Sequence, residues 1–307
     1  MNLLCQLTLM LPVVAMSAAC DASPQHTAPQ HQAKAPVAAV RPGAPVAESA
    51  PPSPQEVLRN IYMGQGPMPW RYETKSGTYH DDEFESEMGF WKAVEFTQDG
   101  HRYFTGFTYK TPDGPFNDPN EAPGPISIDQ ATFLHDNERW RIVDTGFVGE
   151  LEVNRSSRWP RADSHKAIAD HALADGRRLI AIPTREFQNG VDLSAYLIFR
   201  FQPQGMAPST RRKQGYPNGG WSLIGTIPVG EDNGATCDGG AVVPCIANGG
   251  ALQFRPNDAE LPDIHVARTG TEIAAPGKAR RVVPTDHLLY RFDVTRDAYV
   301  RHGQSGA

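Results

Sequence analysis

The four cysteines are the residues of this chain whose type and spacing most directly imply chemistry. Cys5 lies within an apolar N-terminal stretch and Cys20 directly follows it, whereas Cys237 and Cys245 lie in the part that should fold. Two thiols eight positions apart, in a chain built for export, indicate one disulfide that closes a small loop. We therefore predict a Cys237–Cys245 bond and a location outside the cytoplasm.

Acidic and glycine residues surround this cysteine pair. Glu231 and Asp232 precede Cys237, and Asp238 directly follows it. A rigid, exposed loop suits the recognition of another molecule. The alternative is a bond that only protects the loop from proteolysis. On the first interpretation, Glu231, Asp232 and Asp238 are candidate partner-binding residues.

The densest cluster of charge lies between Tyr79 and Glu87. His80, Asp81 and Asp82 belong to this cluster, which has neither the spacing of a calcium loop nor a His-rich zinc spacing. A solvated acidic loop is the simpler interpretation. The partner that fits such a loop is a cationic protein surface, because opposite charges speed encounter. His80, Asp81 and Asp82 are therefore further candidate partner-binding residues.

No linear motif in the sequence identifies an enzyme. The Gly-x-Ser-x-Gly, Ser-x-x-Lys, His-Glu-x-x-His and Walker patterns are all absent. Catalytic residues assembled from distant positions leave no linear trace, so a hydrolase stays open as an alternative. The segment from Asn257 to Ile264 looks like a degenerate form of the Asp-rich turns that bind calcium in some propeller blades. We predict no catalytic residues, no cofactor and no metal.

The N-terminus has the features of an export signal. An apolar stretch before Ala19 is too short to span a bilayer as a helix, and Ser17-Ala18-Ala19-Cys20 follows it. The last four residues resemble a bacterial lipobox, although Ser17 stands where leucine is usual and no Lys or Arg precedes it. We predict that residues 1–20 form a signal peptide and that Cys20 is lipidated. Simple secretion is the alternative, and a cytoplasmic chain with an unusual N-terminus is a third interpretation.

Residues 21–54 have the composition of a tether. They hold eight prolines and nine alanines in 34 residues. Such a segment buries too little apolar surface to offset the entropy of ordering, so we predict an extended, disordered linker. At roughly 3 Å per residue it reaches up to about 100 Å.

Residues 55–307 form the predicted β-rich globular domain. Without Lys34, Arg41, Asp21 and Glu48 of the tether, 27 basic residues face 33 acidic residues, a formal charge of −6. This balance argues against non-specific nucleic-acid binding, which needs a positive surface. We therefore predict no nucleic-acid partner.

The periodicity predicts one short helix followed by many strands. Ser53 is placed to cap a helix that begins at Pro54 and lines one face with Val57, Leu58 and Ile61. β-branched and aromatic runs between Gly, Asn, Asp and Pro then predict strands. These lie near 91–97, 103–109, 126–134, 139–143, 179–184, 193–201, 221–227, 264–267 and 288–293.

An internal repeat predicts how these strands are grouped. A Lys-Ala-aliphatic run precedes Asp99-Gly100, and a second precedes Asp175-Gly176; the strands and tryptophans that follow match as well. Each unit would be a four-stranded antiparallel meander with an Asp-Gly hairpin turn. By this register, residues 167–174 form a strand although their composition favours a helix. The tail from Leu252 to Val300 would supply a third, degenerate unit. We predict a mainly β fold that is either propeller-like or a duplicated sandwich.

Several features together resemble a known kind of bacterial protein. They are the leader with Cys20, the Pro/Ala tether, Gly234-Ala235-Thr236-Cys237 with Cys245, and Pro262–Val266, Gly270-Thr271 and Tyr290–Phe292. This combination resembles uncharacterised proteobacterial periplasmic lipoproteins of β-repeat type. Some lipoproteins of this design are immunity proteins, which protect a bacterium from antibacterial effectors. The resemblance covers the export segment and about the last 75 residues of the chain.

The leading functional expectation is a membrane-anchored, periplasm-facing binding protein without enzymatic activity. In the form that the resemblance implies, it is an immunity protein whose partner is a secreted toxic effector, and its contact with the membrane is a lipid anchor. An envelope polymer hydrolase and a structural envelope lipoprotein are the alternatives.

Overall fold

The structure is a computed structural model that describes residues 49–62, 71–81, 86–112, 124–152, 161–205, 220–240 and 243–303. The chain divides into two units, Met1–Ala47 and Glu48–Ala307, and the elements below all belong to the second. The signal peptide, most of the tether and Cys20 lie outside the described residues, as does Asp82.

One α-helix, α1 (Pro54–Tyr62), precedes the strands, as the sequence predicts. The backbone N–H of Glu56 donates to the Ser53 hydroxyl (3.3 Å), and the N–H of Ser53 donates to the Glu56 carboxylate (2.7 Å). This reciprocal pair satisfies two N–H groups that a helix leaves without partners at its start. Val57 and Leu58 are fully buried on the inner face of the helix.

Among the described residues, three antiparallel sheets follow the helix, so the predicted mainly β fold is confirmed. The first sheet runs in sequence order: β1 (Arg71–Glu73), β2 (Thr78–Asp81), β3 (Ser86–Gln98), β4 (His101–Lys110), β5 (Ile126–Asp136) and β6 (Arg139–Leu151). The second has the order β11 (Trp221–Asp232), β10 (Val191–Phe201), β9 (Arg178–Gln188) and β7 (Arg161–Ala162), with β8 (Ala169–Ala172) also paired to β9. The third has the order β12 (Asn248–Arg255), β13 (Asp263–Ala275), β15 (Leu288–Asp293) and β16 (Ala298–His302), with β14 (Lys278–Arg281) paired to β13.

The predicted repeat appears as two meanders, β3–β6 and β8–β11. The segment with helix-like composition forms the strand β8, as its register in the repeat predicts. The two Asp-Gly turns also lie side by side, because a Cβ placed on Gly176 would be 3.2 Å from the Asp99 carboxylate. The turns differ in length. At Asp99-Gly100 both φ angles are positive, as a two-residue type I′ turn requires, whereas the Gly176 N–H donates to the carbonyl of Leu173 in a longer turn.

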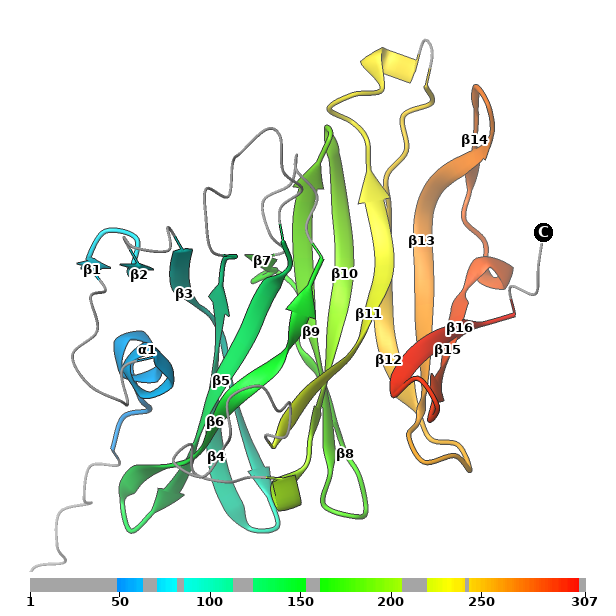
Figure 1. Cartoon of the computed structure of the whole chain (residues 1–307). Helices are drawn as coiled ribbons and strands as arrows, with labels where there is room; N and C mark the ends of the chain where they lie inside the picture. The colour runs from blue at the N-terminus through cyan, green and yellow to red at the C-terminus, as the bar shows by residue number, and fades with distance from the viewer. Residues whose placement is uncertain are drawn as a thin grey trace, which may run out of the picture. The chain divides into compact units, whose positions relative to one another are not determined.

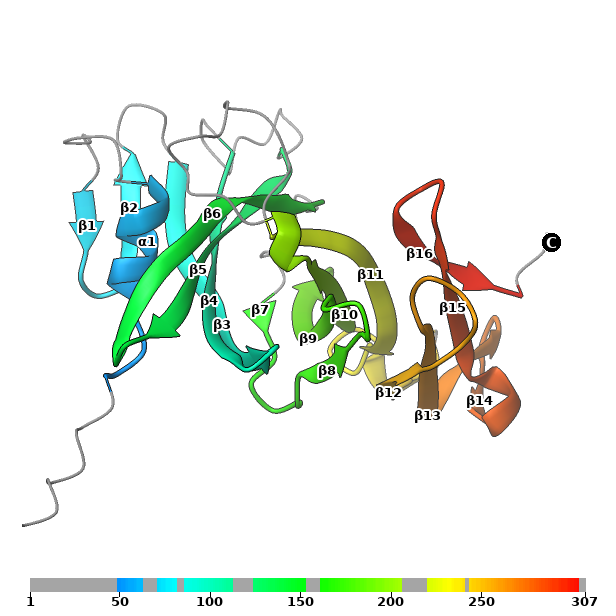
Figure 2. The same ribbon diagram turned by 90° about the horizontal axis from the view of Figure 1, so that it is seen from below.

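The sheets are layered, with the second sheet in the middle and α1 on the far side of the first (Figures 1 and 2). Phe199 and Trp221 pack towards the first sheet, and Ile198 and Ile227 pack towards the third. The middle sheet is therefore buried on both faces, which explains why β9 and β10 contain nearly continuous apolar runs in place of alternation.

The propeller expectation is wrong for the part of the chain that is described. One core cluster joins the first and second sheets and another joins the second and third, but none joins the third back to the first. The three layers thus do not close into a ring, and a propeller needs about four or more blades to do so. A sandwich of the two meanders, extended by the third sheet, is the arrangement that forms.

Candidate functional site

The connection between β11 and β12 is closed by the predicted disulfide. Cys237 and Cys245 are bonded, with their Cα atoms 5.0 Å apart. Cys237 is buried and Cys245 is exposed. We call residues 233–247 the disulfide loop; it lies at the top of Figure 1, beyond the ends of the two strands that it joins.

A buried asparagine ties both ends of the disulfide loop together. The Asn233 side chain donates to the carbonyl of Pro244 (3.0 Å) and accepts from the N–H of Ile246 (2.8 Å). Its own carbonyl accepts from the N–H groups of Thr236 and Cys237. Sequence reasoning missed Asn233, although the Asn-Gly pair that follows Asp232 is a local turn signal. The loop is therefore held by hydrogen bonds as well as by its covalent bond.

The loop also rests on a neighbouring hairpin. Gly190, in the β9–β10 turn with φ of 82°, has no space for a side chain, because a Cβ there would lie 1.9 Å from the Thr236 methyl carbon. The Thr236 hydroxyl donates to the Gly190 carbonyl (3.5 Å). Val243, which closely precedes Cys245, is 43% exposed. The loop therefore combines a supported base with an exposed apolar side chain.

The structure gathers part of the predicted acidic set around this loop. Glu231 and Asp232 end strand β11, and the exposed Asp232 carboxylate accepts from the N–H of Gly234 (2.8 Å). The N–H of Glu231 donates to the Asn248 side chain (3.3 Å). Asp238 begins a 3-10 turn within the loop. The first two candidates thus lie at the base of the loop and the third lies inside it.

An exposed aromatic side chain, which sequence reasoning missed, shares this end of the second sheet. Phe187 on β9 is 52% exposed and pairs in register with Asp192 on β10, which pairs in turn with Asp232 on β11. Residues paired in this way project from the same face of a sheet. The face next to the disulfide loop therefore carries one aromatic and two acidic side chains. A single aromatic residue between Glu186 and Gln188, after the apolar run of β9 has ended, is the local sequence signal for it.

The other predicted cluster lies on a different sheet. His80 and Asp81 belong to β2 in the first sheet, so they are not part of an acidic loop, and Asp81 is only 6% exposed. The His80 ring lies 3.3 Å from the Glu73 carboxylate and 3.0 Å from the Thr78 hydroxyl. The expectation of a solvated loop fails here because Tyr79 is buried beneath α1 and fixes the strand. No described contact brings these residues to the disulfide loop.

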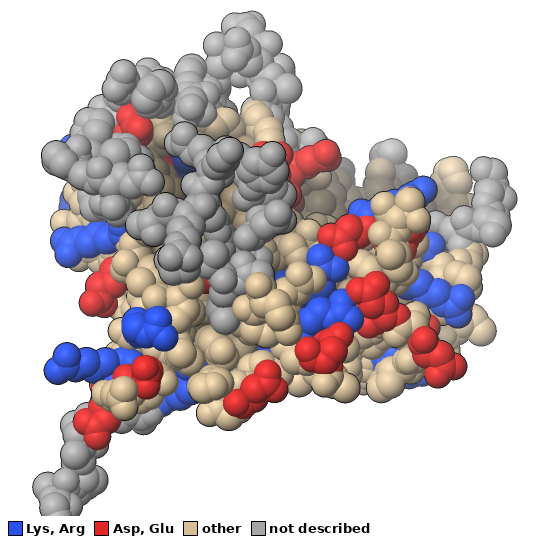
Figure 3. Space-filling model, turned by 60° about the horizontal axis from the view of Figure 1, so that its bottom comes forward, with Lys and Arg blue, Asp and Glu red and all other residues tan. Residues whose placement is uncertain are grey.

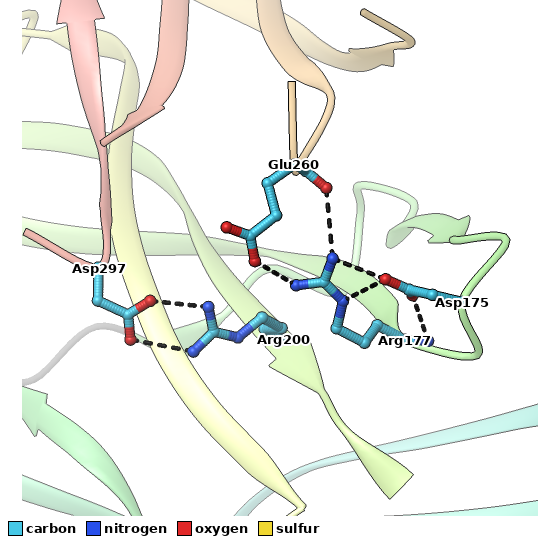
Figure 4. A network of polar contacts seen from close by, with 5 residues as sticks. All are labelled: Asp175, Arg177, Arg200, Glu260 and Asp297. Atoms are coloured by element: carbon cyan, nitrogen blue, oxygen red, sulfur yellow. Dashed lines mark hydrogen bonds and ion pairs between the residues drawn. The ribbon is translucent and has the colours of Figure 1, made fainter. Parts of the chain in front are cut away.

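Several other charged groups of the described residues bind one another. Arg177 pairs with Asp175 (2.7 Å) and Glu260 (2.5 Å), and Arg200 binds Asp297 through two hydrogen bonds of 2.7 and 3.0 Å (Figure 4). Both sets join the second sheet to loops of the third. On the face shown in Figure 3, Lys and Arg side chains lie beside Asp and Glu, so neither sign forms a continuous patch there.

A buried polar chain lies between the first and second sheets. The Trp221 ring N–H donates to the Thr132 hydroxyl (3.1 Å), which donates to Gln130 (2.7 Å). Gln130 donates to the Asp144 carboxylate (2.5 Å), which also accepts from the Gly220 N–H (2.8 Å). The Asp144 side chain is 1% exposed, so solvent and substrate do not reach it in this structure. This chain satisfies polar groups within the core, and its role is structural.

The degenerate calcium-like turn is closed by its own contacts. The Asn257 side chain donates to the Asp263 carboxylate (2.6 Å) and accepts from the N–H of Ala259 (2.9 Å), while Glu260 pairs with Arg177. Among the described residues, no group of three or more His, Cys, Asp or Glu side chains is arranged to hold a metal ion.

Comparison of the chain with protein-family models, curated proteins and solved structures gives no match. Within the described ranges, no helix has the length and apolar content needed to cross a bilayer.

Proposed function

We propose that this chain is an exported, lipid-anchored binding protein of the cell envelope that captures a protein partner through the disulfide loop. The partner in this proposal is a secreted antibacterial effector, and capture neutralises it. The observation that carries the proposal is the loop itself, which is cross-linked, anchored by Asn233 and exposed at Val243. A preformed loop loses little entropy on binding, so its contacts count more fully towards affinity.

Ser49, where the described part of the chain begins, is held away from the disulfide loop. The carbonyl of Ser49 accepts from the Trp140 ring N–H (3.2 Å), and the Ser49 hydroxyl lies 3.3 Å from the His135 ring. These two aromatic residues flank the β5–β6 turn, at the lower left of Figure 1, whereas the disulfide loop is at the top. Ser49 is thus held at the end of the second unit opposite the disulfide loop.

The side chains near the disulfide loop are of the kinds that bind another protein. Phe187 and Val243 offer apolar contact. Glu231 and Asp232 place negative charge at the base of the loop, whereas Asp192 is paired with Arg185 (2.7 Å). Protein interfaces combine an apolar centre with a polar rim in this way. A partner with a cationic surface fits best, because charge of opposite sign speeds association.

The experiment uses the mature chain as bait against the effector encoded beside its gene, with two matched variants. Val243→Arg places a charge on the disulfide loop, and Val294→Arg places the same charge on the β15–β16 turn, where the valine is 67% exposed. We expect the native chain and Val294→Arg to form a stoichiometric complex and to suppress effector toxicity. Val243→Arg should weaken both by at least about tenfold, the loss that about 1.4 kcal/mol represents.

Two results would contradict the proposal. One is the recovery of no partner from the envelope by the native chain together with no secreted effector encoded nearby. The other is equal capture by the two variants, which would separate binding from the loop. Turnover of peptidoglycan or glycan by the purified chain would instead favour the hydrolase. A change in cell shape on deletion, with no rival present, would favour a structural envelope component.

A further inference from the structure

The third sheet contains a cleft that the proposed function does not use. It has a volume of about 510 Å³ and is formed by β13, β14, the 3-10 turn Pro284–Asp286 and the ends of β15 and β16. This volume is within the range of small-molecule sites in proteins. The lining is mostly polar, with Leu288 and Leu289 as its apolar members, so a ligand that fits it would be mainly hydrophilic.

Positive charge exceeds negative charge in this cleft. Arg268, Arg280 and Arg301 line it, together with only two carboxylates, those of Glu272 and Asp286. His287 and His302 add two ring nitrogens each that accept or donate hydrogen bonds. The cleft therefore has one excess positive charge even with both imidazoles neutral.

The two carboxylates are already engaged by two of the arginines. Arg280 binds Asp286 through bonds of 2.7 and 2.9 Å and also contacts Glu272, while Arg268 lies 2.9 Å from Glu272. Asp286 further accepts from the N–H of Val283 (2.8 Å). The hydrogen bonds from Arg280 hold the pKa of the Asp286 carboxyl at about 2, so it stays charged. These pairs fix the guanidinium groups in place, which lowers the entropy lost when a ligand binds.

Arg301 is the one arginine of the cleft that takes no part in these ion pairs. Among the described residues, no carboxylate lies within ion-pair distance of it. Its register partner on β15 is Tyr290. Tyr290 also pairs with Ile264 of β13, and Arg268, four positions further along β13, lies on the same face as Ile264. Arg301 and Arg268 therefore project from the same face of the third sheet, and both line the cleft.

We propose that this cleft binds a small hydrophilic ligand, of the size of a monosaccharide, through a phosphate or carboxylate group held by Arg301 and Arg268. Guanidinium groups bind both kinds of anion through paired N–H donors, and each has five such donors. Glu272 and Asp286 then serve as positioning residues for the arginines and do not contact the anion.

The test titrates the mature chain with three sugars that differ only in charge and its carrier: glucose 6-phosphate, glucuronate and glucose. Binding is measured by calorimetry at fixed ionic strength. We expect at least one anionic sugar to bind in the millimolar range or tighter and glucose not to bind. Whichever anion binds more tightly identifies the headgroup chemistry.

Two variants make the test specific. Arg301→Gln removes the unengaged cation, and Arg296→Gln removes the same charge from the β15–β16 turn, where Arg296 is 72% exposed and lines no part of the cleft. Loss of a charged hydrogen bond predicts a decrease of about tenfold or more for Arg301→Gln and less than about twofold for Arg296→Gln. Because Arg301 is exposed, both variants should fold, which thermal unfolding verifies.

Three outcomes would overturn the proposal: no binding of either anionic sugar at millimolar concentration, glucose binding as tightly as the anions, or equal effects of the two substitutions. The cleft shares no residue with the disulfide loop. Val243→Arg should therefore leave sugar binding unchanged, so failure of this inference and failure of partner capture are distinguishable.

Discussion

The two meanders share one strand order but occupy different environments. In β3–β6, α1 covers the outer face of the sheet, where Val57 packs with Phe104 and Phe133. In β8–β11, an entire third sheet covers the corresponding face. The tight turns also change place. The first meander has them at Asp99-Gly100 and Asn137-Glu138, whereas the second has a two-residue turn at Asn189-Gly190 and joins its last two strands by a long connection.

This difference shows that the same local pattern fixes strand order without fixing what packs on the sheet. The repeat specifies antiparallel neighbours and turns, which are contacts between segments close in sequence. The cover on the second face depends on which apolar side chains project there and on what the rest of the chain offers. The first meander therefore lies in an outer layer of the unit and the second lies in the middle layer.

The largest expected effect comes from adjacent residues of β10 that belong to the two different cores. Phe199 is fully buried towards the first sheet, with its ring 4.7 Å from that of Phe107, and Ile198 is fully buried towards the third. We expect Phe199→Ala to lower the free energy of unfolding by about 3–5 kcal/mol and Ile198→Ala by about 2–5 kcal/mol. Denaturant unfolding followed by circular dichroism measures both.

The shape of the transitions then tests whether the layers unfold together. If the unit is cooperative, both variants shift one common transition, whereas Phe187→Ala, at a half-exposed position, changes it little. A separate early transition in Ile198→Ala alone would instead mean that the third sheet unfolds independently of the meanders.

Removing the disulfide should destabilise the end of the second meander and the third sheet but not the first meander. The bond braces the connection from the second meander to the third sheet. Cys237→Ala with Cys245→Ala should lower the free energy of unfolding by about 2–3 kcal/mol, as expected for a closed loop of this length. Hydrogen exchange should show lost protection at the end of β11 and in β12, while β4 and β5 keep theirs. Equal loss in the first meander would contradict a local brace.

Two glycines show how closely α1 packs on the first sheet and how closely the third sheet packs on the second. A Cβ on Gly106 of β4 would lie 2.6 Å from the Val57 methyl group of α1, whereas a Cβ on Gly225 of β11 would meet Tyr299 of the third sheet at an ordinary 3.4 Å. We expect Gly106→Ala to destabilise by about 1–3 kcal/mol through overpacking. Gly225→Ala should be nearly neutral. Thermal unfolding of the two variants tests this prediction. A larger destabilisation by Gly225→Ala than by Gly106→Ala would show that α1 packs less closely on its sheet than the third sheet does.

The smallest effects come from two carboxyl groups whose pKa values move in opposite directions. Burial raises the pKa of Asp129 in the first meander, so its contribution to stability is full below about pH 4 and is lost as pH rises through the raised pKa. The hydrogen bond from Arg177 lowers the pKa of Asp175 in the second, so its contribution is full above about pH 4 and is lost as pH falls through the lowered pKa.

Substitution of each carboxyl group by asparagine should change the free energy of unfolding in opposite directions. At neutral pH we expect Asp129→Asn to raise the free energy of unfolding, because the Tyr62 hydroxyl can still donate to the amide oxygen and no charge is buried. Asp175→Asn should lower it by no more than about 1 kcal/mol, since the Asp175 side chain is 53% exposed. Stability measured from pH 3 to pH 7 tests the signs, and changes in the same direction would refute this assignment.

Much of the fold was accessible from the sequence because it rests on local periodicity and local chemistry. Ser53 followed by Pro54 predicts the start of α1, alternation and apolar runs predict the longer strands, and the Cys237–Cys245 spacing predicts the disulfide. The repeat even predicts the strand β8 against its own composition. Short edge strands such as β1 and β7 were missed because two or three residues carry no periodicity.

The arrangement of the layers was decided by contacts between residues far apart in the chain. Which face of β10 meets which sheet, the burial of Asp81, and the row from Phe187 to Asp232 all depend on stacking that no short pattern encodes. The cleft is the clearest case, since Arg268, Arg280 and Arg301 come from three strands. Their charges gather only when the third sheet folds, and the free energy for that folding comes from burying apolar side chains such as Ile264 and Tyr290 against the second sheet.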